Sequence, residues 1–238
     1  MTLSIVIPAY NEELRLPKTL EHIVQFFNTK YPPCSLKEIL VVDDGSTDRT
    51  AALVHEWREH LPIRCIRLSK NCGKGAAVRE GVLASHGEYV LSYDADGATP
   101  IGEVRELLAA LREKHADIAV GSRRAGEKPS VRAMQWHRRI LSDLYYRLCM
   151  LLVPEIQDAA CGCKLFQQDV ARHLFSLQKI DRFAFDLEVL SLAKKCGYSL
   201  VEVPVQWNAI AKSKVRIFRD GMEMFYQLLR LYLQRFLP

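Results

Sequence analysis

Residues 89–100 read YVLSYDADGATP, an apolar run that ends on two carboxylates. The run predicts a buried strand, and Asp94 and Asp96 stand where we expect that strand to end. Residues two apart on a strand point to the same face, so both carboxylates can reach one cation. Mg²⁺ and Mn²⁺ prefer oxygen ligands of this kind. A simple turn is the alternative interpretation, because Asp before Gly is common in turns.

Segments typical of strands and of helices alternate on both sides of this stretch. Strand patterns occupy residues 3–10, 37–48, 63–69 and 117–123, and the pattern at 37–48 ends in acids and a turn. Helical patterns occupy residues 15–30, 48–60, 73–85 and 102–115. This alternation predicts an α/β fold with a doubly wound, mainly parallel sheet. Ligands bind beyond the carboxyl ends of the strands in such sheets, so we expect the acid-rich turns to share one cleft.

The pattern changes after about residue 123. A basic segment with Gly and Pro predicts a loop at 123–139, followed by an apolar helix at 140–153, a strand or turn and a helix at 163–177, a helix at 185–197, a strand at 199–207 and a closing helix at 220–237. Gly197 is expected to end its helix, and Pro204 favours an edge strand.

Composition limits the classes of protein that fit. A chain of 238 residues, 49% of them hydrophobic, can bury a core without disulfides or metal staples. A net charge of +5 is too small to indicate nucleic acid, and we expect no nucleic-acid partner. Seven cysteines without a repeated CxxC spacing suggest reduced thiols in a cytosolic protein. Residues 1–10 predict a strand rather than a signal peptide, and no apolar run reaches membrane-spanning length.

Two further turns carry acids after a predicted strand. In VVDDGSTD (41–48), Asp43 or Asp44 can accept a hydrogen bond from a base or ribose, although a strand–helix turn capped by Thr47 or Asp48 explains the same residues. In IPAYNEE (7–13), residues 8–12 can form a wall for a nucleobase and its ribose.

A glycine-rich helix start follows at KNCGKGAAVREG (70–81). Lys70, Lys74 and Arg79 lie near this start, and helix N-termini and lysines attract phosphate. The segment matches neither a Walker A pattern nor GxGxxG. The absence of GxGxxG after the first strand also argues against a nicotinamide-dependent dehydrogenase.

IVIPAYNEE, VVDDGSTD, NCGKGAAVREG and YDADGAT, in this order and spacing, resemble the family 2 glycosyltransferases. The resemblance implies a GT-A fold with an Asp-x-Asp metal motif, matched by Asp94-Ala95-Asp96. The later segments VGSR, DAACGCKLF, RFAFDLEVL and VPVQWNAIAKSKV resemble the dolichyl-phosphate glucosyltransferases and, more distantly, the dolichyl-phosphate mannose synthases. Such enzymes transfer a hexose to a polyprenyl phosphate with inversion, here from UDP-glucose or alternatively from GDP-mannose.

The resemblance also implies roles for single residues. Asp94 and Asp96 would hold Mg²⁺ or Mn²⁺, with Asp96 the more direct ligand; a third metal position of the mannose synthases, often Gln, is Ala98 here. The catalytic residues implied are Asp94, Asp96, Arg123 and Asp186. The nucleotide-sugar contacts implied are Pro8, Tyr10, Asn11, Glu12, Asp43, Asp44, Lys70, Lys74, Asp94, Ala95 and Lys214.

The acceptor side is implied by Arg123, Arg138 and Ser142, which match the family's acceptor-phosphate positions. Arg138 and Ser142 are one helical turn apart and can converge, although a solvated basic turn is the alternative for Arg138. A phosphate acceptor is already a nucleophile, so it needs a strong general base less than a hydroxyl does. Asp186 or Glu188 occupies the position of a base in other members, or orients Lys214 or Arg182.

The resemblance divides the chain into residues 1–123, a nucleotide-sugar-binding core, and residues 124–238, an acceptor-binding and membrane-interface portion of the same domain. The helices at 140–153 and 222–237 are short and apolar with arginines at their edges, so they can lie in a membrane interface or pack in the core. We expect a peripheral, non-spanning protein on the cytoplasmic face of a membrane, with weak lipid binding or a membrane-protein partner.

Two alternatives stay open. The first is a family 2 enzyme with a soluble or polysaccharide acceptor, which needs a general base, with Asp186 as candidate. The second is a nucleotide-binding protein without turnover, against which the complete set of Asp94, Asp96, Arg123 and Lys214 argues.

Overall fold

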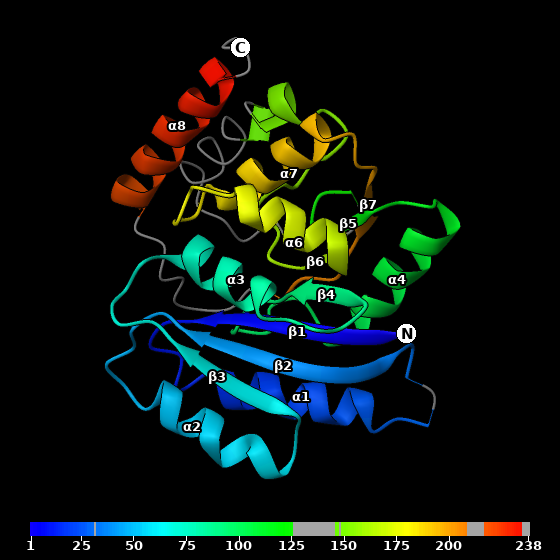
Figure 1. The fold of residues 1–238 in the computed structure, drawn as a ribbon, viewed down its shortest axis with the longest axis vertical. Coiled ribbons are helices and arrows are strands. Elements are labelled where there is room, and N and C mark those ends of the chain that lie inside the picture. Colours follow the sequence, from blue (N-terminus) through cyan, green and yellow to red (C-terminus); the bar gives the residue numbers. More distant parts are fainter. Residues whose placement is uncertain (31, 126–145, 148, 209–216, 235–238) are drawn as a thin grey trace.

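The computed structural model describes residues 1–238 except residues 31, 126–145, 148, 209–216 and 235–238. Within the described residues, one seven-stranded sheet has the order β3-β2-β1-β4-β6-β5-β7 (Figure 1). In that order the strands are β3 Ile63–Arg67, β2 Ser35–Asp43, β1 Thr2–Ala9, β4 Tyr89–Ser92, β6 Lys164–Gln167, β5 Ile118–Ser122 and β7 Leu200–Pro204. Only β6 runs antiparallel to its neighbours among these, so the prediction of a mainly parallel α/β sheet is confirmed.

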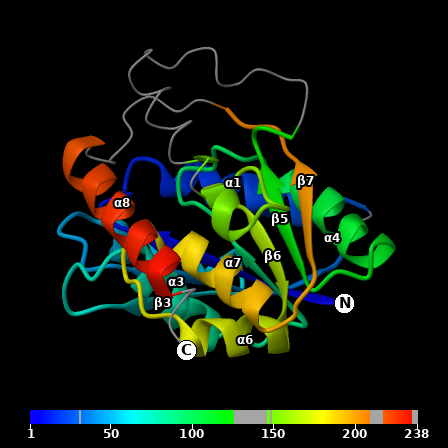
Figure 2. The same ribbon diagram turned by 90° about the horizontal axis from the view of Figure 1, so that it is seen from above.

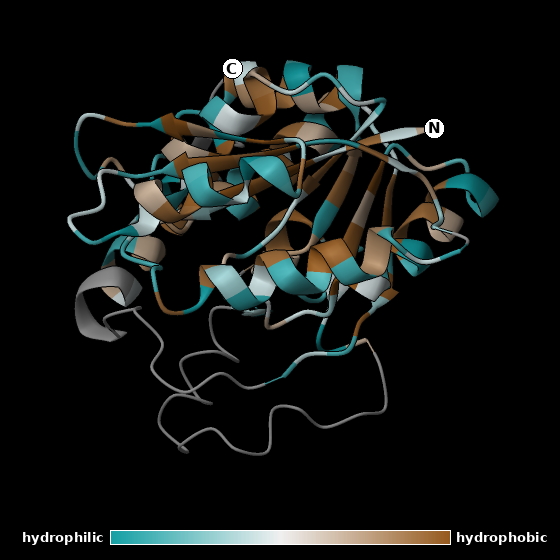
Figure 3. Cartoon of the chain, turned by 90° about the horizontal axis from the view of Figure 1, so that it is seen from below, coloured by the Kyte–Doolittle hydropathy of each residue, from teal (hydrophilic) through white to brown (hydrophobic). Residues whose placement is uncertain are grey.

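Helices cover both faces of the sheet (Figures 1 and 2). One face packs against α1 Leu16–Phe27, α2 Thr50–Glu56 and α4 Val104–Glu113, and the other against α3 Lys74–Leu83, α6 Gln168–Leu177 and α7 Phe185–Lys195. Successive strand residues point to opposite faces, so Ile5 and Ile7 of β1 join the first core while Val6 joins the second. Figure 3 shows hydrophobic residues concentrated along the strands between these layers.

The last helix, α8 Ile217–Gln234, lies outside these two layers, beside α7 (Figure 2). Two short 3₁₀ segments, Trp57–Glu59 and Ile101–Glu103, flank α2 and α4. The predicted helix at 140–153 lies partly outside the described residues, and residues 146–147 and 149–152 are helical. No described helix combines the length and the apolar character that crossing a bilayer requires.

Most predicted elements are present, with shifted ends. The predicted cap of α2 was Thr47 or Asp48, whereas the N-cap residue is Arg49. Asp48 still serves the helix start, because its Oδ1 accepts the Thr50 N–H at 2.9 Å. Helix α7 ends at Lys195 with Cys196 as its C-cap residue, and Gly197, the predicted cap, comes one position later with a φ of +79°. Pro204 lies in the edge strand β7, as predicted.

Strand β6 comes after residue 123 in the chain but lies between two strands that come before it. Val90 of β4 pairs with Phe166, and Val120 of β5 pairs with Lys164. Gly121 beside this seam has no room for a side chain, since an added Cβ would lie 2.9 Å from the Cys163 carbonyl oxygen. The sheet therefore joins residues from both sides of residue 123.

We expect the fragment 1–123 not to fold on its own. Without β6, strands β4 and β5 lose their common partner and leave unpaired backbone groups and apolar side chains open to water. Circular dichroism of the purified fragment should show no cooperative thermal transition, while the full chain should melt cooperatively. A sharp melting transition of the fragment would contradict this prediction.

Candidate active site

Hydrogen bonds join the loops that follow β1 and β2. The Asn11 N–H donates to Ser46 Oγ at 2.9 Å, and the Thr47 N–H donates back to Asn11 Oδ1 at 2.9 Å. The Glu12 N–H donates to Thr50 Oγ1 at 2.8 Å. Asn11 adopts a left-handed backbone with a φ of +53°, a conformation that Asn tolerates better than most residues. The IPAYNEE loop is thus held at the carboxyl end of the sheet.

Asp44 organises the loop that leads into α3. Its buried carboxylate accepts the N–H groups of Cys72 at 2.7 Å and Gly73 at 2.9 Å, and Asn71 Nδ2 at 2.8 Å. Burial raises the pKa of Asp44 above its ordinary value, although these backbone donors oppose that shift. Asp44 therefore fixes the backbone immediately before Lys74, the first residue of α3.

The pair Asp94 and Asp96 lies in a turn beyond β4, not on the strand. The strand ends at Ser92, and the Gly97 N–H donates to the Asp94 carbonyl at 3.2 Å. Thr19 Oγ1 of α1 donates to the Ala95 carbonyl at 2.8 Å. The expectation that strand geometry aligns the two carboxylates is therefore wrong; a turn anchored to α1 brings them together.

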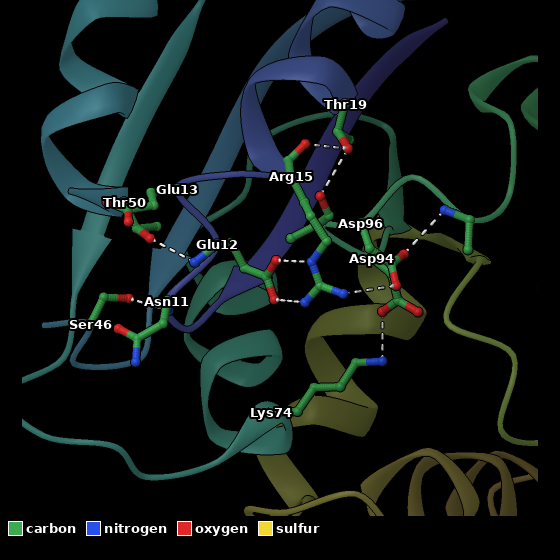
Figure 4. A network of polar contacts seen from close by, with 12 residues as sticks. Asn11, Glu12, Glu13, Arg15, Thr19, Ser46, Thr50, Lys74, Asp94 and Asp96 are labelled. Atoms are coloured by element: carbon green, nitrogen blue, oxygen red, sulfur yellow. Dashed lines mark hydrogen bonds and ion pairs between the residues drawn. The ribbon is translucent and has the colours of Figure 1, made fainter. Parts of the chain in front are cut away.

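Two cations face these carboxylates (Figure 4). Lys74 Nζ lies 2.6 Å from Asp94 Oδ1, and Arg15 Nη1 lies 3.9 Å from Asp96 Oδ2. Arg15 also donates two hydrogen bonds to the Glu12 carboxylate, one of them from Nε to Oε2 at 2.6 Å. The loop after β1, the start of α3 and the turn after β4 thus meet in one network of alternating charge.

The two aspartates differ in their ionisation. Burial favours the neutral form of Asp94, but the charge and hydrogen bond of Lys74 outweigh it and hold its pKa below the ordinary value. The pKa of Asp96 is raised, first by burial and then by the negative charge of Asp94. The two carboxylates are therefore close enough to repel one another, which is the arrangement that a cation relieves.

The pKa of Lys74 is raised. Burial alone would lower it, but the carboxylates of Asp94 and Asp186 outweigh that effect. Lys74 is consequently a fixed positive charge at the start of a helix, where the peptide dipoles add to its attraction for phosphate.

The CGC segment, residues 161–163, forms one wall of the site. A Cβ placed on Gly162 would lie 2.0 Å from Asp94 Oδ2, so only glycine lets this backbone approach the carboxylate. Behind it, Lys164 is 2% exposed and its Nζ donates to Asp186 Oδ1 at 2.5 Å and to the Cys161 carbonyl. Asp186 is itself 7% exposed, so a buried ion pair joins β6 to α7 beneath the site.

Arg123, at the end of β5, is held by Asp158. Its Nε and Nη2 donate to the two oxygens of Asp158 at 2.6 and 2.7 Å, and its N–H donates to the same carboxylate at 3.0 Å. The guanidinium also lies 5.7 Å from the ring centroid of Trp207. Although burial favours the neutral acid, Arg123 keeps the pKa of Asp158 below its ordinary value.

The structure brings together Glu12, Lys74, Asp94 and Asp96, all of which the sequence nominated. Tyr10 lies exposed in the adjoining loop, and Lys70 is exposed next to Gly45. Pro8, at the end of β1, pairs in register with Val42. Ala95, between the two aspartates, is 5% exposed.

Other residues that the sequence suggested for the site form hydrogen bonds or ion pairs with groups of the protein itself. Asp43 is fully buried and accepts the Ser46 N–H at 2.8 Å. Glu188 accepts the N–H groups of Lys179 and Ile180 and so holds a loop. Arg182 lies 3.6 Å from Glu223 of α8.

The nominated residues Arg138, Ser142 and Lys214 lie outside the described residues. The segment before residue 209 does reach the site, because the Asn208 N–H donates to the Ala98 carbonyl at 2.8 Å.

Sequence reasoning missed Arg15, Asp158, Gly162 and Lys164. A lysine inside the apolar run CKLF was a usable signal, because a lone charge in a buried strand requires a partner. Nothing in the local sequence distinguishes Arg15 or Asp158 from surface charges. Among the described residues, no group of three or more His, Cys, Asp or Glu side chains could hold a metal ion.

The sheet and this charged edge define the class: the chain has the GT-A fold of nucleotide-sugar glycosyltransferases. Glucosyl-3-phosphoglycerate synthase from Mycobacterium tuberculosis, solved with Mn²⁺, UDP-glucose and phosphoglyceric acid, matches with a TM-score of 0.74 at 19% identity, over 97% of this chain and 79% of that one. Residues 4–175 match the model of glycosyl transferase family 2, and the chain belongs to that family.

Two similar proteins align with most of this chain. Dolichyl-phosphate beta-glucosyltransferase from Dictyostelium discoideum is 38% identical over 96% of this chain and 73% of its own length. The human protein of the same name is 36% identical over 95% of this chain and 74% of its own length.

Removing either partner of the Lys164–Asp186 pair should destabilise the fold strongly. Removing one partner leaves the other charge buried, so Lys164→Met and Asp186→Leu should each lower the free energy of unfolding by about 3–5 kcal/mol. The double variant should cost less than the sum of the two single changes. Urea unfolding followed by tryptophan fluorescence measures this coupling, and strictly additive effects would contradict it.

Proposed function

We propose that this protein transfers glucose from UDP-glucose to a dolichyl-type polyprenyl phosphate, inverting the anomeric centre. Membership of family 2 and the names of the similar proteins support this assignment. The single observation that carries it is the Asp94–Asp96 turn, faced by Lys74 and Arg15 at the carboxyl edge of the sheet. An anionic diphosphate can be held there by cations on one side and a carboxylate-bound metal on the other.

On the donor side, we assign the uridine and ribose to the loops after β1 and β2, with Pro8, Tyr10, Asn11 and Glu12 as the wall. These loops are tied to one another, so they offer a preorganised surface. Asp43 and Asp44 support them from below, Lys70 borders the opening, and Ala95 lies between the metal ligands. Lys74 is the cation nearest the Asp94 carboxylate and would neutralise charge that grows on the leaving diphosphate.

Asp94 and Asp96 fit a divalent cation. The Asp94 charge raises the pKa of Asp96, so the two oxygens repel one another in a partly buried turn. Two protein carboxylates with substrate phosphates are a common ligand set for Mg²⁺, and Mn²⁺ accepts the same ligands. The metal, when bound, supplies positive charge next to the leaving diphosphate. We assign Asp96 as the more direct ligand, because Asp94 Oδ1 already contacts Lys74.

On the acceptor side, the surroundings of Asp186 favour a phosphate nucleophile over a hydroxyl. Asp186 is buried and bound to Lys164, so it is poorly placed to take a proton from a sugar hydroxyl. A phosphate monoester is already anionic and needs cationic positioning instead. We assign Arg123, Arg138 and Ser142 to that positioning, and Lys214 to closing the donor site.

We also propose a peripheral contact with the cytoplasmic face of a membrane. Helix α8 exposes a row of large apolar side chains, which suits an interfacial helix. The side chains in this row are those of Met222, Phe225, Tyr226, Leu229 and Leu233. All seven cysteines are free, which suits a reducing compartment. A membrane-protein partner would strengthen this contact.

A matrix of donors and acceptors tests the proposed reaction. UDP-glucose, UDP-N-acetylglucosamine and GDP-mannose are each incubated with a short polyprenyl phosphate, the matching polyprenol, phosphoglyceric acid and a glucan. We expect glucosyl transfer only from UDP-glucose to the polyprenyl phosphate, with a β linkage by NMR. Transfer to the hydroxyl acceptors would establish the soluble-acceptor alternative, and mannose transfer would change the donor.

Metal dependence should rest on Asp96. Asp96→Asn keeps the size of the side chain but removes a charge that a hard cation needs, so turnover should fall by about 10²–10³-fold with little change in melting temperature. Mn²⁺ affinity, measured by electron paramagnetic resonance with UDP present, should fall in parallel. Asp169→Asn, an exposed acid on α6, is the matched control and should change neither.

The same metal should bind less tightly in acid. The pKa of Asp96 lies above its ordinary value, so protons compete with the cation as the pH falls through that raised pKa. Mn²⁺ affinity should therefore be constant well above it and decline below it. Full activity in a chelator, or an affinity that does not change with pH, would defeat the assignment.

A further inference from the structure

A pocket of about 400 Å³ lies between the end of α6, α7 and α8, and none of its lining residues belongs to the Asp94–Asp96 turn. Its apolar lining comes from all three helices and from the segment before residue 153. These residues are Leu152, Leu177, Ile180, Leu192 and Leu231. A hydrocarbon chain is the kind of group that such a lining desolvates favourably.

Four cations border the same pocket: Lys179, Lys194, Lys195 and Arg230. Glu188 is the acid in the lining: its carboxylate accepts the N–H groups of Lys179 at 3.1 Å and Ile180 at 2.7 Å, and its negative charge offsets part of the charge of Arg230. One cation, Lys194, is paired with Glu155 at 2.6 Å. The excess of positive charge at an apolar pocket selects for a ligand with an anionic head and an apolar tail.

Two polar atoms in the pocket wall are buried without a hydrogen-bond partner among the described residues. They are Ser191 Oγ of α7 and Gln227 Oε1 of α8. A buried polar atom without a hydrogen-bond partner is energetically unfavourable. Hydroxyl or ester groups of a ligand, or water carried with it, would offer these atoms partners.

The pocket borders the exposed apolar row of α8. Met222, Phe225, Tyr226, Leu229 and Leu233 recur at helical spacing and lie 48–74% exposed, while Leu228 is buried against the core. Arg230 follows Leu229 and lines the pocket, so it lies between the apolar row and the cavity. A helix that rests on a lipid surface with this row would place the pocket beside the lipid head groups.

We propose that this pocket binds an anionic membrane phospholipid, with one acyl chain among the leucines and the phosphate at Lys195 and Arg230. The site lies across α7 from the ion pair beneath the active site. Asp186 pairs with Lys164 there, and Glu188, two residues further along the helix, lines the pocket. Residues two apart on a helix point in nearly opposite directions. The proposal does not rest on the identity of donor or acceptor.

Isothermal titration of the full chain with dioctanoyl phosphatidylglycerol, kept below its micelle concentration, tests this site. We expect saturable binding of one lipid, with dioctanoyl phosphatidylcholine weaker by about tenfold because it lacks net charge. Lys195→Glu combined with Arg230→Glu should weaken phosphatidylglycerol by about tenfold or more. Both side chains are exposed, so this double variant should keep its melting temperature.

The matched control reverses two exposed charges at the end of α4, Arg112→Glu with Lys114→Glu, and should bind the lipid as the unaltered chain does. Equal binding of the two lipids, or an unchanged affinity in the pocket variant, would overturn the proposal. Displacement by inorganic phosphate alone would reduce the site to an anion site. Displacement by a short polyprenyl phosphate at lower concentration than phosphatidylglycerol would reassign it to the acceptor.

Discussion

The ion pair between Lys74 and Asp94 connects the start of α3 with the turn after β4, and the site is built on these two segments. Lys74 is placed by the loop that Asp44 holds, and Asp94 is placed by β4, by Thr19 behind the turn and by Gly162 in front of it. Each partner would be costly alone in a partly buried position, because an unpaired charge there loses hydration without compensation. Pairing makes both charges tolerable and, in the proposed reaction, would fix where a diphosphate meets positive charge.

Other charged side chains around the site are also paired with an opposite charge. Arg123 is matched to Asp158, Lys164 to Asp186 and Arg15 to Glu12, and each pair joins segments that are distant in sequence or in the sheet, except the local Glu12–Arg15 pair. Asp96 is the exception in charge balance: its cation is 3.9 Å away and the Asp94 charge lies nearby. Among the described residues, Asp96 is therefore less closely paired with a cation than Asp94 is, which is the condition that the proposed metal would relieve.

The sequence predicted the fold class and most elements, because apolar periodicity and acid-rich turns are local signals. Local signals failed where pairing decides the structure. The apolar run through Tyr93 predicted a longer strand, whereas β4 ends at Ser92. The Tyr93 N–H still donates to the Val6 carbonyl of β1 at 2.9 Å, and its hydroxyl donates to the Thr99 carbonyl at 2.5 Å. The ion pairs of Asp158 and Lys164 join residues 35 and 22 positions apart, and β6 pairs with strands that lie further away in the sequence. Periodicity encodes none of these contacts. The close approach of Gly162 to Asp94 was equally invisible.

The place of β6 in the sheet has a consequence for synthesis on the ribosome. Strands β4 and β5 emerge first and are neighbours in sequence, yet the finished sheet requires a gap between them that β6 fills later. A nascent chain that closed this gap early would have to reopen it, a slow step for a sheet built on distant contacts. Until residues 164–167 leave the exit tunnel, both strand edges stay available to other chains. Translation speed through the intervening segment, and chaperones that cover those edges, should therefore control the yield of native protein.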